Sequence, residues 1–196
     1  MIVVAYTVLG LVLGSIPFAF YVAKHHLGVD VRGSGRDRNP GAVNAWKAGG
    51  WQYGVVGGVL DFAKGFTPVF AAKYGSDLSD WALVPVAVAP VLGHAFTPLL
   101  GFRGGKAVAA SFGVWAGLTA GWGFLVYAAT CGVFWRLQTA DAWATFAGQL
   151  GLLVFLLASD AEPAYLVVWL VQGTVVIWKH RRELRQVPRL RWSDVG

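Results

Sequence analysis

Long apolar stretches separated by short polar loops are the main pattern of this chain. Five of them approach the roughly 20 residues that a helix needs to cross the hydrocarbon core of a bilayer: about 2–23, 51–73, 81–101, 142–159 and 163–179. A further apolar stretch, 106–136, is too long for one such helix and short for two. The first stretch has no basic residue before it and no small-residue cleavage site, so we predict a membrane span there and not a signal peptide.

The distribution of charge indicates how stretch 106–136 crosses. Lys and Arg in short loops favour the cytoplasmic side, and they concentrate in segments 24–47, 103–106 and 179–191. One helix over 106–136 would put the basic tail opposite the other two segments, whereas a hairpin turning near Gly117–Gly121 puts all three on one side. We therefore predict an all-α integral membrane protein with seven transmembrane helices, two of them short, an outside N-terminus and a cytoplasmic C-terminus.

The composition agrees with a membrane protein. Of the 196 residues, 56% are hydrophobic and 13% are charged, against roughly 25% charged residues in a typical soluble domain. The single cysteine, Cys131, excludes an internal disulfide and a metal site built on cysteines. The net charge of +6 is scattered along membrane loops, which argues against nucleic acid as a partner. We expect one membrane-embedded domain over residues 1–196 and no metal site.

The first polar segment, GSGRDRNPGAVNAWK at 33–47, has the composition of an anion site. Its small residues let successive backbone N–H groups point at one oxyanion, and Ser34, Asn39 and Asn44 carry side-chain donors. We predict that a helix begins after Asn39-Pro40, because proline suits the first helical position and the N-terminus of a helix favours an anion. The alternative, a solvated loop whose basic residues only set the membrane topology, stays open.

The second polar segment, GHAFTPLLGFRGGKAVAASFG at 93–113, places Arg103 and Lys106 at a span boundary. Two glycines before Lys106, followed by small residues that open another helix, suit a phosphate, because backbone donors and a point charge then lie together. The spacing is not that of a Walker A motif. His94 lies about two helical turns inside the preceding span, where polar side chains usually face the bundle interior. Both a structural role and a substrate-binding role stay open for it.

Two further segments carry polar residues. The tail WKHRRELRQVPRLRW at 178–192 is typical of a segment that anchors a last span to anionic lipid headgroups, and His180 is the tail residue better suited to a site than to an anchor. In the second span, LDFAKGF places Asp61 and Lys64 on one helix face, where they can form an ion pair that supports a polar site. The chain has no G-x-S-x-G elbow, so its chemistry depends on binding an anionic substrate and holding it in place.

In their order along the chain, these segments resemble the bacterial acyl-phosphate:glycerol-3-phosphate acyltransferases. The resemblance covers nearly the whole chain and rests on GSIPFAFYVAK, a Ser-Gly…Asn-Pro-Gly-Ala-x-Asn segment, LDFAKGF, GHAFTPLLGFRGGKAVAASFG and the Lys-His at the start of the tail. It implies a seven-helix enzyme of the bacterial inner membrane with its active site at the cytoplasmic face. It also implies transfer of a fatty acyl chain from acyl phosphate to the sn-1 hydroxyl of glycerol 3-phosphate, giving lysophosphatidic acid and phosphate, with no cofactor and no metal. Membrane lipid would surround the enzyme.

The resemblance also implies roles for individual residues. Ser34, Lys47 and Lys106 would bind the phosphate of glycerol 3-phosphate or of the donor. Asn44 and His180 would orient the acceptor or polarise the acyl phosphate. The implied catalytic set is His180, Asn44 and Lys106. The implied substrate-binding set is Ser34, Gly35, Asn39, Gly41, Lys47, His94, Arg103, Gly104 and Gly105, in which the glycines would permit close backbone approach.

Four departures from the family pattern fall in the same segments. Residues 36–38, Arg-Asp-Arg, are an insertion in the first segment, and Val43 replaces a usual threonine. Lys47 stands where arginine is common, which loses bidentate recognition of phosphate. Glu183-Leu184 replace Asn-Ile after the tail histidine, and an acid there opposes an anionic substrate unless a nearby arginine pairs with it. The alternatives are a diverged relative that acylates another phosphorylated acceptor or is inactive, and a small membrane transporter.

Overall fold

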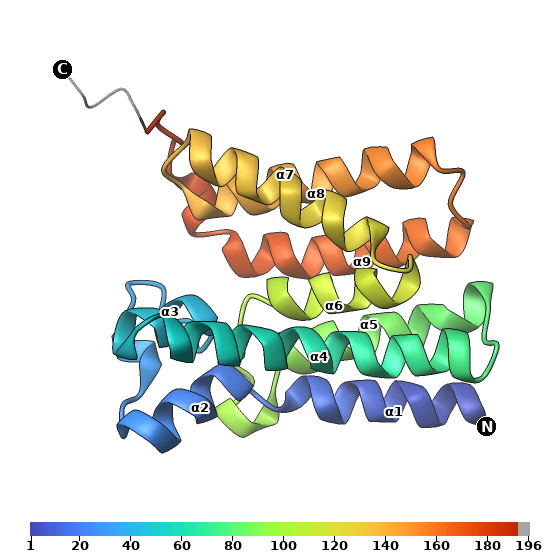
Figure 1. Cartoon of the computed structure of the whole chain (residues 1–196), viewed down its shortest axis with the longest axis horizontal. Helices are drawn as coiled ribbons and strands as arrows, with labels where there is room; N and C mark the ends of the chain where they lie inside the picture. The colour runs from blue at the N-terminus through green and yellow to red at the C-terminus, as the bar shows by residue number, and fades with distance from the viewer. Residues whose placement is uncertain (192–196) are drawn as a thin grey trace.

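The computed structural model describes residues 1–191, and helices make up most of it (Figure 1). Residues 192–196, the end of the predicted domain and of its basic tail, lie outside the described residues. Within the described chain the fold is all-α, as predicted. The α-helices are α1 (Ile2–Ser15), α2 (Phe18–Leu27), α3 (Ala42–Gly49), α4 (Trp51–Gly75), α5 (Leu83–Ala95), α6 (Val108–Leu118), α7 (Trp122–Leu137), α8 (Asp141–Ala158) and α9 (Pro163–His180). Short 3₁₀ turns are η1 (Val31–Gly33), η2 (Asp80–Ala82), η3 (Pro98–Leu100) and η4 (Glu183–Arg185).

Four segments of the described chain are long and apolar enough to cross a membrane, by their length and composition. They are Ile2–Leu27, Trp51–Gly75, Leu83–Leu100 and Asp141–Ala158, and Val108–Leu118 is a shorter apolar helix. The remaining helices α7 and α9 run alongside them in the bundle (Figure 1). Helical segments therefore occupy every stretch for which the sequence predicts a span.

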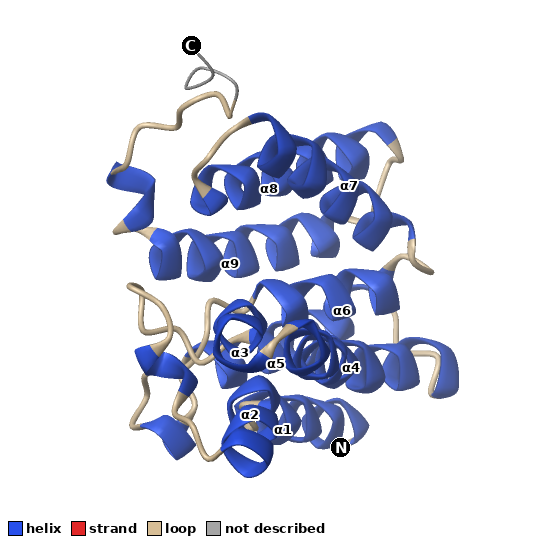
Figure 2. Cartoon of the chain, turned by 60° about the vertical axis from the view of Figure 1, so that its left-hand side comes forward, coloured by secondary structure: helices blue, strands red, loops and turns tan. Residues whose placement is uncertain are grey.

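Two groups of helices build the bundle (Figure 2). One contains α1, α4, α5 and α6, and the other contains α7, α8 and α9. The most extensive pairs are α4 with α6, α1 with α5 and α7 with α8, while α5 and α9 join the two groups. Glycines allow these close approaches: a Cβ at Gly113 would collide with the Phe62 carbonyl oxygen, and one at Gly14 with that of Pro90. Small residues at the contact are typical of helix pairs in membranes.

The first predicted span is confirmed as the candidate span Ile2–Leu27, but it consists of two helices, α1 and α2. The break lies at Ile16, whose backbone is extended (φ −80°, ψ 113°), directly before Pro17. Proline has no N–H, and its ring disfavours helical conformation at the preceding residue. The backbone carbonyls freed by the break accept hydrogen bonds from side chains of other segments. Lys64 Nζ donates to the Ile16 carbonyl at 2.6 Å, and the Thr97 hydroxyl donates to the Ser15 carbonyl.

The apolar stretch 106–136 folds as the predicted hairpin of two short helices. The turn between α6 and α7 covers residues 119–121, within the predicted region. Gly121 has φ +94°, a left-handed conformation that glycine adopts without strain. The Thr119 hydroxyl accepts a hydrogen bond from the Gly123 N–H at 2.7 Å, which satisfies a backbone donor in the first turn of α7.

Most polar connections gather toward one end of the bundle, opposite the N-terminus (Figure 1). Loop 28–41, α3 and the C-terminal end of α9 lie there. The tail after α9 folds back over the α7–α8 connection, because the Thr139 N–H donates to the Arg189 carbonyl at 3.0 Å and Trp143 Nε1 donates to that of Gln186 at 2.8 Å. The same fold-back forms an isolated β-bridge between Gln138 and Leu190.

Candidate active site

A cleft of about 730 Å³ opens at this end of the bundle. Its polar lining comes from segments far apart in the sequence: Asp37, Asn39, Lys47, Asp61, His94, Lys106, Asp141, Thr145, His180 and Arg191. Its apolar lining includes Val43 and Trp46 of α3, Phe112 of α6 and Trp135 of α7. A concave site with an apolar wall and a few convergent polar groups is typical of small-molecule binding.

Lys106 joins the three basic segments. Its Nζ forms ion pairs with Asp37 Oδ2 at 2.7 Å and with Glu183 Oε1 at 3.1 Å. Asp37 belongs to the loop before α3, Lys106 to the connection between α5 and α6, and Glu183 to the tail. The predicted convergence of these segments is therefore confirmed by direct side-chain contacts. The sequence suggests an arginine as the partner of Glu183, and the structure provides Lys106 instead.

The carboxylate of Asp37 is also bound by the first polar segment. Its Oδ1 accepts hydrogen bonds from Asn44 Nδ2 at 2.9 Å and from the Asn39 N–H at 3.2 Å. Asn44 Nδ2 also donates to the Asn39 carbonyl at 2.8 Å. Burial raises the pKa of Asp37, but the hydrogen bonds from Lys106 and Asn44 and the charge of Lys106 outweigh it and lower the pKa to about 2. Asp37 is therefore ionised throughout the neutral pH range.

Helix α3 begins after Asn39-Pro40, as predicted, but Pro40 is not its first residue. Its first helical residue is Ala42, and Gly41 is the N-cap with an extended backbone (φ −84°, ψ 178°). Asn44 lies in the first turn with 1% of its surface exposed, and its amide points back toward the preceding loop. A Cβ at position 35 would collide with the Asn44 side chain, so Gly35 allows the loop to close over that amide.

His180 reaches the cleft from the last turn of α9. It is 4% exposed, and its Nδ1 lies 2.8 Å from the carbonyl oxygen of Val176. Because a carbonyl oxygen only accepts hydrogen bonds, Nδ1 carries the proton, and the neutral ring keeps its lone pair on Nε2. Nε2 is therefore the ring nitrogen that can accept a hydrogen bond from a bound hydroxyl group.

Asp61 and Lys64 form the predicted ion pair beneath the cleft. Lys64 Nζ lies 2.8 Å from Asp61 Oδ1, and the two side chains are only 1% and 3% exposed. His94 Nδ1 lies 3.7 Å from the same carboxylate oxygen. Because Lys64 also donates to the Ile16 carbonyl, the pair holds α4 against the break between α1 and α2.

His94 lies in the last turn of α5, which ends at Ala95, and the candidate span continues to Leu100, so His94 lies well inside that span as predicted. The connection to α6 packs against this turn: the Gly105 N–H donates to the His94 carbonyl at 3.1 Å. A Cβ at Gly105 would collide with His94 Nε2, and one at Gly104 with the His94 carbonyl oxygen. These two glycines therefore let the backbone before Lys106 approach α5 closely.

The structure brings about half of the predicted site residues to the cleft. The ones that line it are Asn39, Gly41, Lys47, His94, Lys106 and His180. Asn44 lies behind Asp37 and binds its carboxylate. The remaining ones stand outside the cleft lining as the described chain forms it: Ser34, Gly35, Arg103, Gly104 and Gly105.

Sequence reasoning missed four charged residues of this site, and it does not mention one of them, Asp141, at all. It marks Asp37 and Glu183 only as departures from a family pattern, although an acid inserted among cations is a usable signal for Asp37. It places Arg191 only in the lipid-anchoring tail. Arg191 reaches the cleft because its N–H donates to the Leu137 carbonyl at 3.1 Å and its Nε to that of Trp135 at 2.8 Å. The sequence carries no signal for this return of the tail over α7.

Cys131 and the potential metal ligands also bear on the chemistry of the site by their positions in the described chain. Cys131 is half-buried on α7 and lines the cleft among apolar neighbours. Within residues 1–191, no group of three or more His, Cys, Asp and Glu side chains could hold a metal ion.

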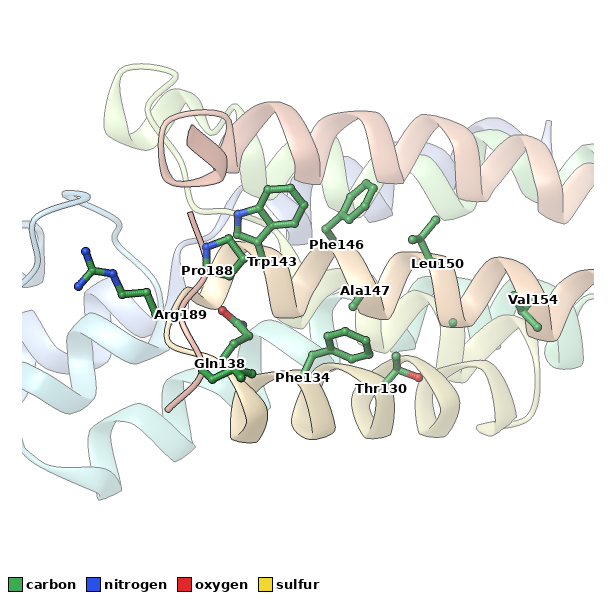
Figure 3. A pocket seen from close by; sticks show the side chains of 12 residues that line it. Thr130, Phe134, Gln138, Trp143, Phe146, Ala147, Leu150, Val154, Pro188 and Arg189 are labelled. Carbon is green, nitrogen blue, oxygen red and sulfur yellow. The ribbon is translucent and has the colours of Figure 1, made fainter. Parts of the chain in front are cut away.

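A second, apolar groove of about 550 Å³ lies between α7 and α8 (Figure 3). Phe134 contributes to one wall, Leu150 and Val154 contribute to the other, and tail residues Pro188 and Arg189 stand at one end. Val154 is 65% exposed and Leu150 45%, so this surface suits lipid chains better than water. None of the predicted site residues lines this groove.

Comparison with known proteins identifies relatives along nearly the whole chain. The family model for glycerol-3-phosphate acyltransferase matches residues 4–189. Glycerol-3-phosphate acyltransferase 1 of Thermotoga maritima is 32% identical over 187 residues, covering 88% of this chain and 91% of that protein. The glycerol-3-phosphate acyltransferase of Desulfovibrio desulfuricans is 36% identical over 188 residues, covering 94% of this chain and 81% of that protein.

Solved structures agree with these sequence matches. The crystal structure of PlsY (YgiH), an integral membrane glycerol 3-phosphate acyltransferase, in its glycerol 3-phosphate form superposes with a TM-score of 0.83 at 32% identity, covering 93% of this chain and 90% of that chain. The lysophosphatidic acid form of PlsY gives a TM-score of 0.81. These similarities confirm the predicted family and an integral membrane fold. The chain therefore belongs to the glycerol-3-phosphate acyltransferase family.

Proposed function

We propose that this protein transfers a fatty acyl group from acyl phosphate to the sn-1 hydroxyl of glycerol 3-phosphate, forming lysophosphatidic acid and phosphate for phospholipid synthesis. The observation that carries the proposal is the position of Lys106. Its ammonium lies where three polar segments meet, in a cleft that also has an apolar wall. The solved PlsY forms with glycerol 3-phosphate and lysophosphatidic acid support this acceptor and this product.

The cleft offers the groups that such a transfer needs. Lys106 and Lys47 supply positive charge for a phosphate, and His180 Nε2 can accept a hydrogen bond from a hydroxyl group of glycerol 3-phosphate and so orient it. Val43 and Trp46, both more than half exposed, form an apolar wall for the start of the acyl chain. Ser34, Gly35, Asn39 and Asn44 would shape the phosphate-binding loop, and Arg103 would add to the positive potential outside it.

The reaction needs no covalent enzyme intermediate. The hydroxyl oxygen of glycerol 3-phosphate bonds to the acyl carbon, and the bond from that carbon to the phosphate oxygen of the donor breaks. The hydroxyl proton leaves with the released phosphate, which acts as the base. The contribution of the protein is then to bring two anionic molecules together in a fixed orientation and to neutralise their charge.

The proposal includes seven membrane crossings, formed by α1 with α2, by α5 with η3, and by α4, α6, α7, α8 and α9. The basic segments 24–47, 103–106 and 179–191 lie toward the cleft, whereas Asp77 and Asp160 lie in connections at the opposite end (Figure 1). Because Lys and Arg favour the cytoplasm, the cleft would face the cytoplasm and the N-terminus the outside. The membrane would be the inner membrane of a bacterium.

A diverged relative that acylates another phosphorylated acceptor is the second candidate. The ion pairs of Asp37 and Glu183 with Lys106 favour it, because both carboxylates oppose an anion at this lysine. A panel of phosphorylated alcohols supplied as acceptors separates the two candidates: the main proposal expects glycerol 3-phosphate to be acylated most efficiently.

Acyl transfer by the purified protein in lipid tests the proposal directly. Palmitoyl phosphate and labelled glycerol 3-phosphate are supplied together, and palmitoyl-CoA replaces the donor in a parallel reaction. We expect lysophosphatidic acid only from palmitoyl phosphate. A folded protein that forms no product with either donor, or one that uses palmitoyl-CoA equally well, would contradict the proposal.

A further inference from the structure

The carboxylate of Asp37 is bound by a set of hydrogen-bond donors that would suit a phosphate equally well. Oδ2 lies 2.7 Å from Lys106 Nζ, and Oδ1 accepts hydrogen bonds from the Asn44 amide and the Asn39 N–H. A cation, an amide and a backbone N–H that converge on one anion are the kind of donors with which proteins bind phosphate oxygens. Because Asp37 also lines the cleft, its carboxylate lies between these donors and an incoming ligand.

We propose that Asp37 is a specificity-determining residue: it is the internal counter-anion of Lys106, and a substrate phosphate must replace it there. The inference rests on the proposed function, because the replacing anion is the phosphate of glycerol 3-phosphate or of the acyl donor. A phosphate dianion carries more charge and more acceptor oxygens than a carboxylate, so it displaces Asp37 more readily than a monoanion does. Asp37 thereby selects phosphate esters over carboxylates and other singly charged ligands.

Glu183 also contacts the ammonium of Lys106. It stands outside the cleft lining, and its Oε1 lies 3.1 Å from Lys106 Nζ. Its Oε2 is buried without a hydrogen-bond partner within residues 1–191. Glu183 can therefore stay on Lys106 while a phosphate enters from the cleft, so Asp37 is the carboxylate in the path of the ligand.

The position of Asp37 on the inserted residues 36–38 explains how it can leave. The insertion lies in the loop between η1 and α3, so its displacement requires no change in a helix. Arg36 and Arg38 flank Asp37 and are exposed, which offers the displaced carboxylate new partners. Arg38 has φ +52°, an uncommon conformation for a residue other than glycine, so the loop is held in this form by its contacts.

Binding of inorganic phosphate to the full-length protein in lipid nanodiscs tests the inference, because it requires no acyl transfer. Asp37→Asn keeps the size of the side chain, and Asp37→Ala removes it. By isothermal titration calorimetry, we expect both variants to bind phosphate about three- to tenfold more tightly than the wild type, the range expected when a competing, partly exposed ion pair is removed.

Two matched controls remove the same charge elsewhere. Asp30 is the N-cap of η1, before the loop that carries Asp37, and pairs with Arg32 at 2.5 Å, so Asp30→Asn should leave the Kd for phosphate unchanged. Asp141 lines the cleft, and among the described carboxylates only Asp37 and Glu183 pair with Lys106. Asp141→Asn should therefore change the Kd by less than about twofold, the effect of a charge that does not compete directly.

Steady-state kinetics then show which of the two substrates carries the phosphate that replaces Asp37. In Asp37→Asn, a lower KM for glycerol 3-phosphate identifies the acceptor phosphate as the anion that replaces Asp37, and a lower KM for palmitoyl phosphate identifies that of the donor. Unchanged KM values for both substrates would overturn the inference. So would an unchanged or weaker Kd for phosphate in folded Asp37 variants, or an equal gain in Asp141→Asn. Failure of the proposed function looks different: the wild type would form no lysophosphatidic acid, while Asp37→Asn would still gain phosphate affinity.

Discussion

Replacing Lys106 with alanine tests whether one ammonium group binds the substrate phosphate. Its two ion partners, Asp37 and Glu183, lie at 2.7 and 3.1 Å, and the Lys106 side chain is 18% exposed. A hydrogen bond to a charged group contributes about 1.5–3 kcal/mol, so losing it at a phosphate lowers kcat/KM roughly ten- to hundredfold. The two carboxylates left without their cation would also repel the phosphate, so we expect the loss to reach or exceed the upper end of this range.

The same substitution should leave the protein folded. Partly exposed ion pairs contribute about 0.2–1 kcal/mol each, so losing two of them lowers the melting temperature by less than about 8 °C. The assay measures kcat and KM with palmitoyl phosphate and labelled glycerol 3-phosphate in nanodiscs, alongside thermal unfolding. Lys24→Ala is the matched control, because Lys24 is an exposed lysine on α2 outside the cleft. Near wild-type kcat/KM in folded Lys106→Ala, or an equal loss in Lys24→Ala, would refute this reasoning.

Three further predictions concern stability. Asp61 and Lys64 form an ion pair in which the side chains are only 3% and 1% exposed. Asp61→Asn or Lys64→Met leaves the other partner buried without its counter-charge and should lower the free energy of unfolding by about 3–5 kcal/mol. A loss below about 1 kcal/mol in chemical unfolding would contradict this. Gly105→Ala forces a Cβ into the imidazole on α5 and should cost about 1–3 kcal/mol, whereas Gly75→Ala, which meets open space, should be neutral by the same measurement. The pKa of Asp37 falls from 3.8 to about 2 on folding, so its stabilisation is complete above pH 3.8 and is lost as the pH falls through about 2. Asp37→Asn should therefore weaken acid destabilisation in that window alone, and a change of slope between about pH 5 and 8 would argue against this assignment.

The helical framework could be predicted from the sequence because hydropathy and charge each act over many residues. The hairpin at residues 119–121 follows from the requirement that three basic segments share one side, and the structure confirms it. The break at Ile16 escaped prediction because a continuous apolar run outweighed a single Pro17. The start of α3 escaped prediction for a related reason: proline at the first helical position is a preference, and Gly41 takes the capping position instead.

For the candidate site, too, one part could be predicted from the sequence and another part could not. Lys106 and Asn44 belong to segments whose composition indicates an anion site, and His180 stands out as the site candidate in a tail that is typical of a lipid anchor. Their partners depend on tertiary geometry that no local pattern encodes. Asn44 binds the carboxylate of Asp37, and His180 Nδ1 binds a carbonyl of its own helix. Sequence therefore predicts which residues have suitable chemistry, while folding decides which atoms remain available to a substrate.

Two acids that the sequence interpretation marks as departures from the family pattern, Asp37 and Glu183, contact one atom. An isolated acid near a phosphate site would weaken binding, and Asp37 and Glu183 lie in segments nearly 150 residues apart. Both nevertheless contact Lys106 Nζ, so the ammonium beside the apolar wall of the cleft has two counter-charges. A charge in such a place is costly unless it is paired. The carboxylates thus stabilise the charge of Lys106, and an incoming phosphate has to compete with the same contacts.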